Sequence, residues 1–472
     1  MNTPAIDELI DEALQAWEVP GVAVAIVGDN RVLYVKGRGV KDSHTRQAVT
    51  PDTIFPLASC TKAFTTTLLA QLVDDGVLDW DDPVRQHLPW FHLADPLADA
   101  NVTMRDLVTH RTGVASHDFL WYRAPWPPAE VVRKMAWLRP SKSFRSTFIY
   151  QSTMFTAAGL ALGATTKSSW QAQVQQRLLT PLAMKRTYLT TPEALRAGDH
   201  ATPHRRDADG QVQAIPWYVI EHPEPAGSLH SCARDMTKWL QLQLGNGRLG
   251  DKRLVSAVQL AETRTPQIPL RLTGVHRAFN PDTLQMSYGM GWIIQDYRGQ
   301  LMVSHAGAID GFRAHVTLLP QANLGIVLLS NLHQSQMNLA LSNTLVDHLL
   351  GLPYKDWHTS FRAVERTVQA EADKRKQTLV QARRPDLKPA LPLSAYVGSY
   401  VEPAYGHGKV TLENDRLVWQ WSSFRCPLDH HRQDAFFLSE EHLGDHLISF
   451  QIEDGAVKSL TFLDMTFKRP SP

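Results

Sequence analysis

The sequence predicts an α+β domain followed by a small all-β domain. Two β-rich runs surround a Gly-Asp-Asn turn within residues 21–37, which is the pattern of a β-hairpin, and β-rich runs return only between 289 and 330. Most of the sequence between these regions, about 55–285, has helical patterns. From residue 391 onward, apolar and polar residues alternate around Glu-Asn-Asp and Glu-Asp-Gly turns, which is typical of antiparallel hairpins. The first domain is therefore expected to join its two ends in one antiparallel sheet.

Two helices are expected to cover one face of this sheet. The N-terminal segment has a helical pattern with Leu9, Ile10, Leu14 and Trp17 on one side, and a second helix is expected near 336–350. The remaining strands of the sheet are expected near 289–294, 300–305, 312–319 and 324–330.

A change in composition separates the two domains. Residues 356–390 are rich in charge and end in prolines, so we expect a helical connector followed by an extended linker. The predicted organisation is a first domain at 1–355, the connector and linker at 356–390, and the all-β domain at 391–472.

Composition excludes several classes of protein. The formal net charge of +1 argues against a nucleic-acid partner, and no run of 18 apolar residues is present that could cross a membrane. The N-terminus has no signal-peptide pattern, so the sequence as written predicts a cytoplasmic protein; a signal peptide before Met1 would make it periplasmic or secreted. Cys60, Cys232 and Cys426 are an odd number without metal-like spacing and are expected to be free thiols. No metal or organic cofactor is expected.

The segment Ser59-Cys60-Thr61-Lys62 places a hydroxyl and an amine one helical turn apart. Side chains at i and i+3 share a helix face with Cβ atoms roughly 5–6 Å apart, so Lys62 can take the proton of Ser59. An isolated S-x-x-K pattern is weak evidence. This one is unique in the sequence, however, and the apolar residues that follow it predict a buried helix.

Two further motifs follow in the chain. Tyr150-Gln151-Ser152 precedes a helix of small residues and could place a phenol against Lys62, where a nearby cation favours loss of the phenol proton. The alternative for Tyr150 is a buried tyrosine with a satisfied hydroxyl. His305-Ala306-Gly307 lies in the first of three consecutive β-rich runs, where a glycine would let a substrate backbone lie close.

Taken together, these three motifs resemble those of the serine β-lactamase and penicillin-binding protein superfamily, nearest to its class C β-lactamase, D-aminopeptidase and esterase branch. The resemblance covers roughly residues 5–352 and includes VTMRDLVTHRTGV, PAGSLHSCARDMTKWL, MSYGMGWII and HAGAIDGF. It implies a β-lactamase/transpeptidase-like fold, in which an antiparallel sheet flanked by helices is joined to a helical lobe. Residues 391–472 resemble the small lipocalin-like β-barrel often appended to such hydrolases.

The resemblance also implies roles for individual residues. Ser59 would be the acyl-forming nucleophile, Lys62 and Tyr150 the proton-transfer pair, and His305 a further catalytic group that lines the cleft with Gly307. The oxyanion hole would consist of the backbone N–H groups of Ser59 and Ala308.

Departures from the family pattern bear on the substrate. Ser152 replaces the usual asparagine of the second motif, which removes an amide donor, and His305 replaces the usual lysine of the third motif. A histidine is largely neutral near pH 7, so an anionic substrate gains less here. The sequence therefore favours a peptidase or esterase over an antibiotic-destroying enzyme.

Other candidate substrate contacts each have a structural alternative. In relatives, the region after THRTG forms a loop at the cleft mouth, so Trp121 and Tyr122 are expected either to form an acyl-group pocket or to cover a helix. Asp310 is expected either to contact a substrate amine or to form an Asx turn before Gly311.

The predicted function is that of a serine hydrolase which cleaves a small amide or ester through an acyl-enzyme on Ser59. The alternatives are a class C-like β-lactamase, a penicillin-binding receptor that is acylated with little turnover, and a scaffold that uses the β-barrel for protein interaction. The barrel could equally cap the cleft, bind a ligand, mediate formation of a homo-oligomer or serve only as a packing module.

Overall fold

The computed structural model describes residues 3–220 and 224–470, so the outermost residues of the predicted domains, 1–2 and 471–472, lie outside the described part. The chain divides into two compact units that do not follow its linear order. The first unit comprises Met1–Phe91, Asp95–Ser116 and Pro140–Glu365, and the second comprises His92–Ala94, His117–Arg139 and Arg366–Pro472.

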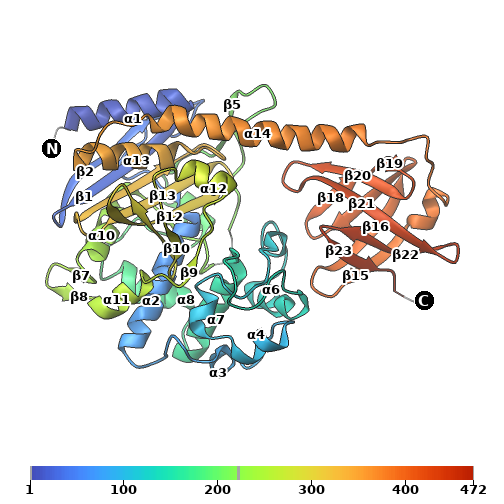
Figure 1. The fold of residues 1–472 in the computed structure, drawn as a ribbon, viewed down its shortest axis with the longest axis horizontal. Coiled ribbons are helices and arrows are strands. Elements are labelled where there is room, and N and C mark those ends of the chain that lie inside the picture. Colours follow the sequence, from blue (N-terminus) through green and yellow to red (C-terminus); the bar gives the residue numbers. More distant parts are fainter. Residues whose placement is uncertain (1–2, 221–223, 471–472) are drawn as a thin grey trace. The chain divides into compact units, whose positions relative to one another are not determined.

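The first unit is built on an antiparallel sheet that joins its two ends. Its strands are β1 (Gly21–Gly28), β2 (Arg31–Gly39), β9 (Ile268–Pro269), β10 (Met286–Tyr288), β11 (Ile293–Tyr297), β12 (Gln300–Ile309), β13 (Phe312–Leu319) and β14 (Leu324–Ser330). Within the described residues these eight strands lie in the order β2-β1-β14-β13-β12-β11-β10-β9 (Figure 1). Every neighbouring pair is antiparallel. The pairing of β1 with β14 confirms that the hairpin predicted at 21–37 shares a sheet with the late strands.

Turn residues set the ends of these strands. Asp29 and Asn30 link β1 to β2, and both have a positive φ, as a two-residue hairpin turn of type I′ requires. The strand predicted near 289–294 is wrong: Gly291 has φ +76°, and the chain turns between β10 and β11 there. The strand predicted at 300–305 continues to Ile309, because the next turn comes only at 310–311.

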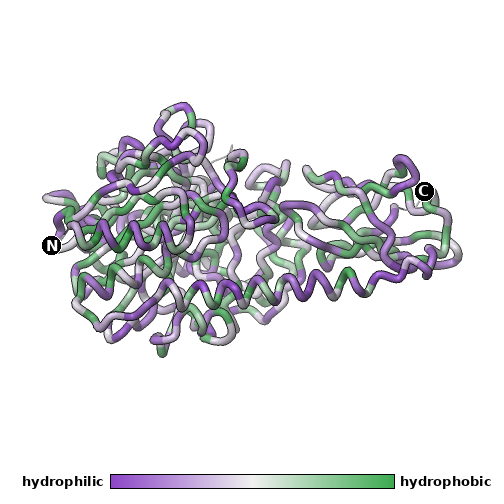
Figure 2. Tube along the Cα trace, turned by 90° about the horizontal axis from the view of Figure 1, so that it is seen from above, coloured by the Kyte–Doolittle hydropathy of each residue, from purple (hydrophilic) through white to green (hydrophobic). Residues whose placement is uncertain are grey.

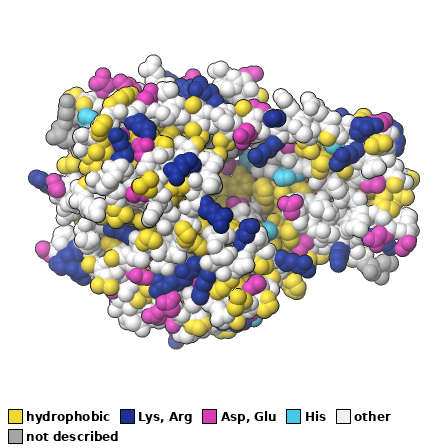
Figure 3. All heavy atoms as spheres, in the orientation of Figure 1, with side chains coloured by type: hydrophobic (Ala, Val, Ile, Leu, Met, Phe, Trp, Pro, Cys, Tyr) yellow, Lys and Arg dark blue, Asp and Glu magenta, His cyan; other side chains and the backbone are white. Residues whose placement is uncertain are grey.

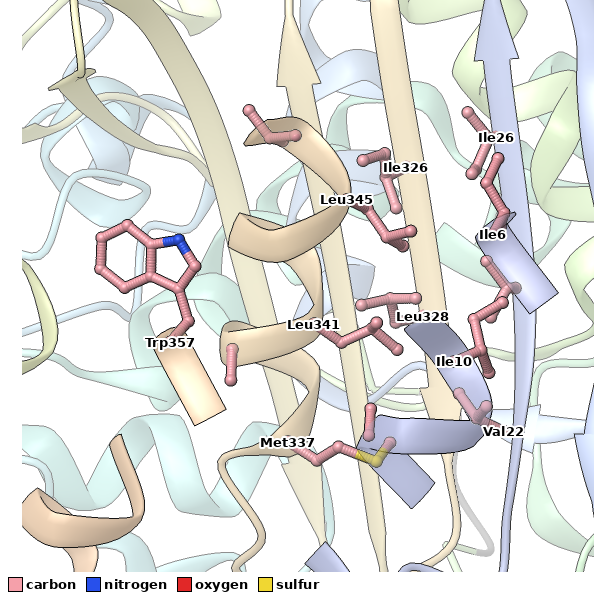
Figure 4. Close-up of a cluster of buried hydrophobic side chains, with 14 of the residues drawn as sticks. Ile6, Ile10, Val22, Ile26, Ile326, Leu328, Met337, Leu341, Leu345 and Trp357 are labelled. Atoms are coloured by element: carbon pink, nitrogen blue, oxygen red, sulfur yellow. The ribbon is translucent and has the colours of Figure 1, made fainter. Parts of the chain in front are cut away.

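Two helices cover one face of the sheet, as predicted. They are α1 (Thr3–Trp17) and α13 (Met337–Leu350). The buried stripe of α1 consists of Ile6, Ile10, Ala13 and Trp17, while Leu9 and Leu14 lie at its margins. Figure 4 shows side chains of α1, β1, β14 and α13 packed together in this core.

The opposite face of the sheet packs against α10 (Ala233–Leu244), which contacts β1 and β14. The rest of the helical lobe contains short strands among its helices. Its helices are α2 (Thr61–Asp74), α3 (Val84–His87), α4 (Pro96–Asn101), α5 (Met104–Leu107), α7 (Ser152–Thr166), α8 (Trp170–Val174), α9 (Thr191–Arg196), α11 (Ala257–Thr263) and α12 (Gly274–Phe279), and its strands are β3 (Phe55–Pro56), β4 (His204–Arg206), β5 (Val212–Ala214), β6 (His230–Ser231), β7 (Arg248–Leu249) and β8 (Lys252–Arg253).

The predicted connector is a helix, α14 (Trp357–Gln381). Only its first turns contribute buried side chains, Trp357 and Phe361, and in Figure 2 the tube of this long helix is mostly hydrophilic. Among the described residues, no helix combines the length and apolar character needed to span a membrane. On the face drawn in Figure 3, side chains of both charges are interspersed, in keeping with the formal net charge of +1.

The C-terminal region forms the predicted antiparallel barrel. Residues 366–470, which are described without a gap, contain nine strands in the order β18-β17-β16-β15-β23-β22-β21-β20-β19, and the sheet curls into a nearly closed barrel. Aromatic side chains such as Trp419, Trp421, Phe462 and Phe467 fill its interior. The strands are β15 (Gly398–Glu402), β16 (Gly406–Glu413), β17 (Arg416–Trp421), β18 (Phe424–Pro427), β19 (Asp429–Arg432), β20 (Ala435–Glu440), β21 (Gly444–Glu453), β22 (Ala456–Phe462) and β23 (Met465–Lys468).

A segment from the middle of the chain packs against this barrel within the second unit. Residues 117–139 include α6 (Pro128–Lys134). The His117 Nδ1 lies 2.9 Å from the Tyr405 hydroxyl, and the ring centroids of Trp126 and Trp421 are 6.1 Å apart. The barrel therefore contacts a segment from the middle of the chain, which no pattern in the sequence predicted.

Candidate active site

The candidate nucleophile lies at a strained turn before a helix. Ser59 is the middle residue of a 3-10 turn, Ala58–Cys60, that leads directly into α2. The residue before it, Ala58, has φ +46°, a left-handed conformation that is uncommon for residues other than glycine and that is concentrated at functional sites. Ser59 is partly exposed, whereas its neighbours on both sides are buried.

The structure brings Lys62 to Ser59. The Lys62 side chain is fully buried, and its Nζ lies 3.1 Å from Ser59 Oγ, 3.4 Å from Ser152 Oγ and 2.9 Å from the carbonyl oxygen of Ala226. The Ala226 carbonyl can only accept, so one N–H of Lys62 points to it. The two serine hydroxyls can each donate or accept, so a neutral Lys62 could donate to Ala226 and accept the proton of Ser59.

Tyr150 packs its ring against the same amine. Lys62 Nζ lies 4.8 Å from the centroid of the Tyr150 ring and 5.4 Å from that of Phe155. Ser152 begins α7, and the preceding Gln151 caps this helix by accepting from the N–H of Thr153. The cap thus fixes the start of the helix that carries Ser152.

His305 lies on β12 with both ring nitrogens engaged. Its Nδ1 donates to the carbonyl oxygen of Ala306 at 2.7 Å, and its Nε2 accepts from the Tyr288 hydroxyl at 3.1 Å, the tautomer being assigned from this network. Burial and the nearby charge of Lys62 lower the pKa of His305 to about 3. His305 is therefore neutral at pH 7 and presents no cation to a substrate carboxylate.

Gly307 allows β12 to lie against the chain that leads into Ser59. A Cβ atom at this position would lie 2.1 Å from the carbonyl oxygen of Leu57, closer than any van der Waals contact permits. The space beside Gly307 is thus occupied by the protein's own backbone, whereas the sequence analysis expected a substrate backbone there.

Replacing Gly307 by alanine is expected to destabilise the first unit. Overpacking against backbone atoms typically costs about 1–3 kcal/mol, because neither partner can rotate away. We expect a lower denaturation midpoint for Gly307→Ala in a thermal or urea titration. The matched control is Gly227→Ala, since a Cβ there has no neighbour nearer than 3.7 Å. Equal midpoints for the two variants would contradict the close packing at Gly307.

The register of the β12–β13 hairpin directs the N–H of Ala308 away from β13. In an antiparallel pair, residues that exchange hydrogen bonds alternate with residues that do not. The two-residue turn at 310–311 closes on a hydrogen-bonded pair, so Ala308, opposite Arg313, belongs to the other set. The pairing of β11 with β12 ends at Ser304. The N–H of Ala308 therefore faces the edge of β12 that β11 does not cover.

The other predicted residues have contacts of their own. Asp310 is buried in the turn before Gly311, whose φ is +77°. Trp121 and Tyr122 belong to the second unit: Trp121 Nε1 donates to Asp118, and the Tyr122 hydroxyl lies 3.3 Å from Nδ1 of His442 in the barrel.

Sequence reasoning missed three groups that surround the site. Tyr288, His110 and the carbonyl of Ala226 all contact predicted site residues or their neighbours. Each lies in a stretch that was noted for its family resemblance, so position within a motif was the available signal. Without the tertiary contacts, the sequence could not assign a role to any of these three residues.

The cysteines are structural. All three are free and buried, which confirms the prediction of free thiols. The Cys60 Sγ donates to the carbonyl of His305, and burial raises the pKa of this thiol to about 12, so Cys60 is unreactive next to Ser59. Among the described residues, no group of three His, Cys, Asp or Glu side chains could hold a metal ion.

Two family models and a curated relative match the chain. The family described as Beta-lactamase matches residues 6–350, and a domain of unknown function, DUF3471, matches residues 382–470. The chain is 30% identical to the unguisins hydrolase ungD′ of Aspergillus campestris over 434 residues, which cover 87% of this chain and 78% of that protein.

Solved structures share the fold. The octameric penicillin-binding protein homologue from Pyrococcus abyssi superposes with a TM-score of 0.66 at 22% identity, covering 99% of this chain and all of the other. The D-amino acid amidase from Ochrobactrum anthropi superposes with a TM-score of 0.62 at 20% identity, covering 74% of this chain and 99% of the amidase.

Proposed function

Because the chain belongs to the β-lactamase family, we propose that it is a serine hydrolase that cleaves a small amide or ester through an acyl-enzyme on Ser59. The observation that carries this proposal is the 3.1 Å separation of Ser59 Oγ from the buried Nζ of Lys62. Burial makes an ammonium ion costly, which favours a lysine that can act as a base.

The proposed reaction has two halves. Lys62 as a neutral amine, or Tyr150 as a phenolate, accepts the Ser59 proton while Oγ attacks the substrate carbonyl carbon. The resulting oxyanion accepts hydrogen bonds from the N–H groups of Ser59 and Ala308, and the leaving amine or alcohol departs with the proton. A water molecule then attacks the acyl-enzyme ester and loses a proton to the same base. The bond between the acyl carbon and Oγ breaks, Oγ takes this proton from the base, and the acid is released with the regenerated serine.

The environment of His305 supports a neutral or cationic substrate over an anionic one. With Nδ1 and Nε2 both engaged and the ring neutral, His305 lines the site without attracting a carboxylate. Ser152 offers Lys62 a hydroxyl but supplies no amide donor for a substrate carbonyl. Both features weigh against the class C-like β-lactamase.

A further substrate contact is part of the proposal. Asp310 would contact a substrate amine. The name of one structural neighbour, a D-amino acid amidase, favours amides among the proposed substrates. The octameric state of the Pyrococcus homologue supports a homo-oligomer.

A substrate panel tests the proposal. The purified protein is assayed with p-nitrophenyl esters, D-amino-acid amides, the matching L-amides and nitrocefin, each with Ser59→Ala as the control. We expect Ser59-dependent turnover of an amide or an ester and little turnover of nitrocefin. Efficient nitrocefin hydrolysis would favour the β-lactamase, and stoichiometric acylation without turnover would favour the receptor. Activity that survives in Ser59→Ala would contradict the proposal.

A further inference from the structure

His110 holds the backbone on both sides of Tyr150. The carbonyl oxygen of His110 accepts from the N–H of Ile149 at 2.9 Å, and its Nδ1 accepts from the N–H of Gln151 at 3.0 Å. One residue therefore fixes the chain immediately before and immediately after the candidate proton-transfer tyrosine.

The His110 ring also packs directly against Tyr150. The two ring centroids are 4.2 Å apart, and the His110 ring is 4.6 Å from that of Tyr288 and 5.3 Å from that of Phe155. His110 is fully buried among these rings. Its position thus determines where the Tyr150 ring can lie relative to Lys62.

The hydrogen bond from Gln151 requires a neutral His110. Nδ1 can accept only when the ring proton is on Nε2. Burial lowers the pKa of His110 well below its ordinary value, and a positive charge on the titratable groups that face it, Lys62 and His305, would lower it further. Nδ1 therefore remains an acceptor throughout the neutral pH range.

Two features of His110 are unfavourable for a residue with only a packing role. Its φ of +56° is left-handed, and its Nε2 has no hydrogen-bond partner within the described residues. An asparagine would adopt this φ more easily and could supply the same acceptor. Strained or unsatisfied groups of this kind are concentrated at functional sites.

We propose that His110 is a positioning residue for the reaction at Ser59, and that its Nδ1 and carbonyl oxygen fix Tyr150 in the geometry needed for proton transfer with Lys62. The inference rests on the proposed function of this site. His110, in the THRTG segment, is thereby added to the proposed site as a residue that acts through Tyr150 and does not contact the substrate.

Two substitutions separate the acceptor from the ring. His110→Phe keeps an aromatic ring but removes the acceptor for Gln151, whereas His110→Asn keeps an acceptor at the same distance from the backbone. For His110→Phe we expect kcat to fall about 10–100-fold with KM changed less than about threefold, because misplacing a proton-transfer group by about 1 Å can cost 10²-fold. We expect His110→Asn to recover most of this loss.

A double-mutant cycle distinguishes positioning from general stability. In a Tyr150→Phe background, His110→Phe should lower kcat less than about twofold further, since the group that it positions is already absent. An equal loss of kcat in both backgrounds would overturn the proposal, as would wild-type kcat in His110→Phe or failure of a folded His110→Asn to recover activity.

A measurement that does not depend on activity completes the test. Hydrogen exchange followed by mass spectrometry on a peptide containing Gln151 should show a protected amide in the wild type and in His110→Asn, and faster exchange in His110→Phe. Equal protection in all three proteins would show that His110 Nδ1 does not hold the Gln151 N–H next to Tyr150, and this would overturn the proposal even if the site proved inactive. Failure of the proposed function would instead appear as a wild type without labelling or turnover, or as labelling and turnover that do not depend on Ser59. The two failures are therefore distinguishable.

Discussion

Replacing Ser59 by alanine is expected to lower kcat/KM by at least about 10⁴-fold for any amide or ester that the wild type turns over. Removal of a nucleophile abolishes the covalent route and leaves only what binding and the oxyanion hole contribute. Ser59 is partly exposed and, within the part of the chain that the structure describes, donates no hydrogen bond to a distant element, so the fold should be retained. Steady-state kinetics on the panel substrate, with circular dichroism to verify folding, measure the effect.

The control is an alanine substitution at a serine outside the site. Ser399 is exposed on β15 of the barrel, so Ser399→Ala should keep wild-type kcat/KM. A Ser59→Ala protein that retains more than about a tenth of wild-type activity would show that another group performs the chemistry.

Replacing Lys62 by methionine is expected to lower kcat about 10²–10⁴-fold, the range of a general base. Methionine has a similar length and apolar stem, so it should fill the buried site without the amine that lies between Ser59 and Ser152. The loss should appear mainly in kcat, because Lys62 is fully buried and acts on the serine. Stopped-flow acylation kinetics separate this step from deacylation.

Lys62→Arg is the informative companion variant. A guanidinium keeps the positive charge but cannot be deprotonated near neutral pH, so it cannot serve as the base. We expect Lys62→Arg to be about as inactive as Lys62→Met. Activity near that of the wild type in Lys62→Arg would mean that the charge, rather than a transferable proton, is what the site needs.

The sequence predicted the parts of the fold that depend on local patterns. Alternation and turn residues located the hairpin of β1 and β2, the strands β13 and β14, and the barrel, because these signals act between neighbours in the chain. The strand predicted near 289–294 was misplaced and β10 was not predicted, since the sequence does not show which glycine of the Gly-Met-Gly stretch takes a positive φ.

In the candidate site, the sequence could predict a contact between residues that lie one helical turn apart. Ser59 and Lys62 meet because they are three residues apart on a helix. The contacts of His110 with Ile149 and Gln151, and of Tyr288 with His305, join segments that are distant in sequence, and only the tertiary structure shows them.

The packing of residues 117–139 on the barrel is also a tertiary property. This segment pairs His117 with Tyr405 and Trp126 with Trp421, residues about 290 positions away along the chain. Changes in composition divide the chain into continuous segments. They could not assign residues 117–139 to the same unit as the barrel, because that assignment depends on contacts between segments that are distant in sequence.

The most direct test of the central claim is covalent labelling of Ser59. The wild type and Ser59→Ala are treated with a fluorophosphonate probe, and intact-mass and peptide mass spectrometry locate the adduct. The account predicts one probe per wild-type chain, on the peptide containing Ser59, and no adduct in Ser59→Ala. An unlabelled wild type, or equal labelling of the two proteins, would contradict the assignment of Ser59 as the nucleophile.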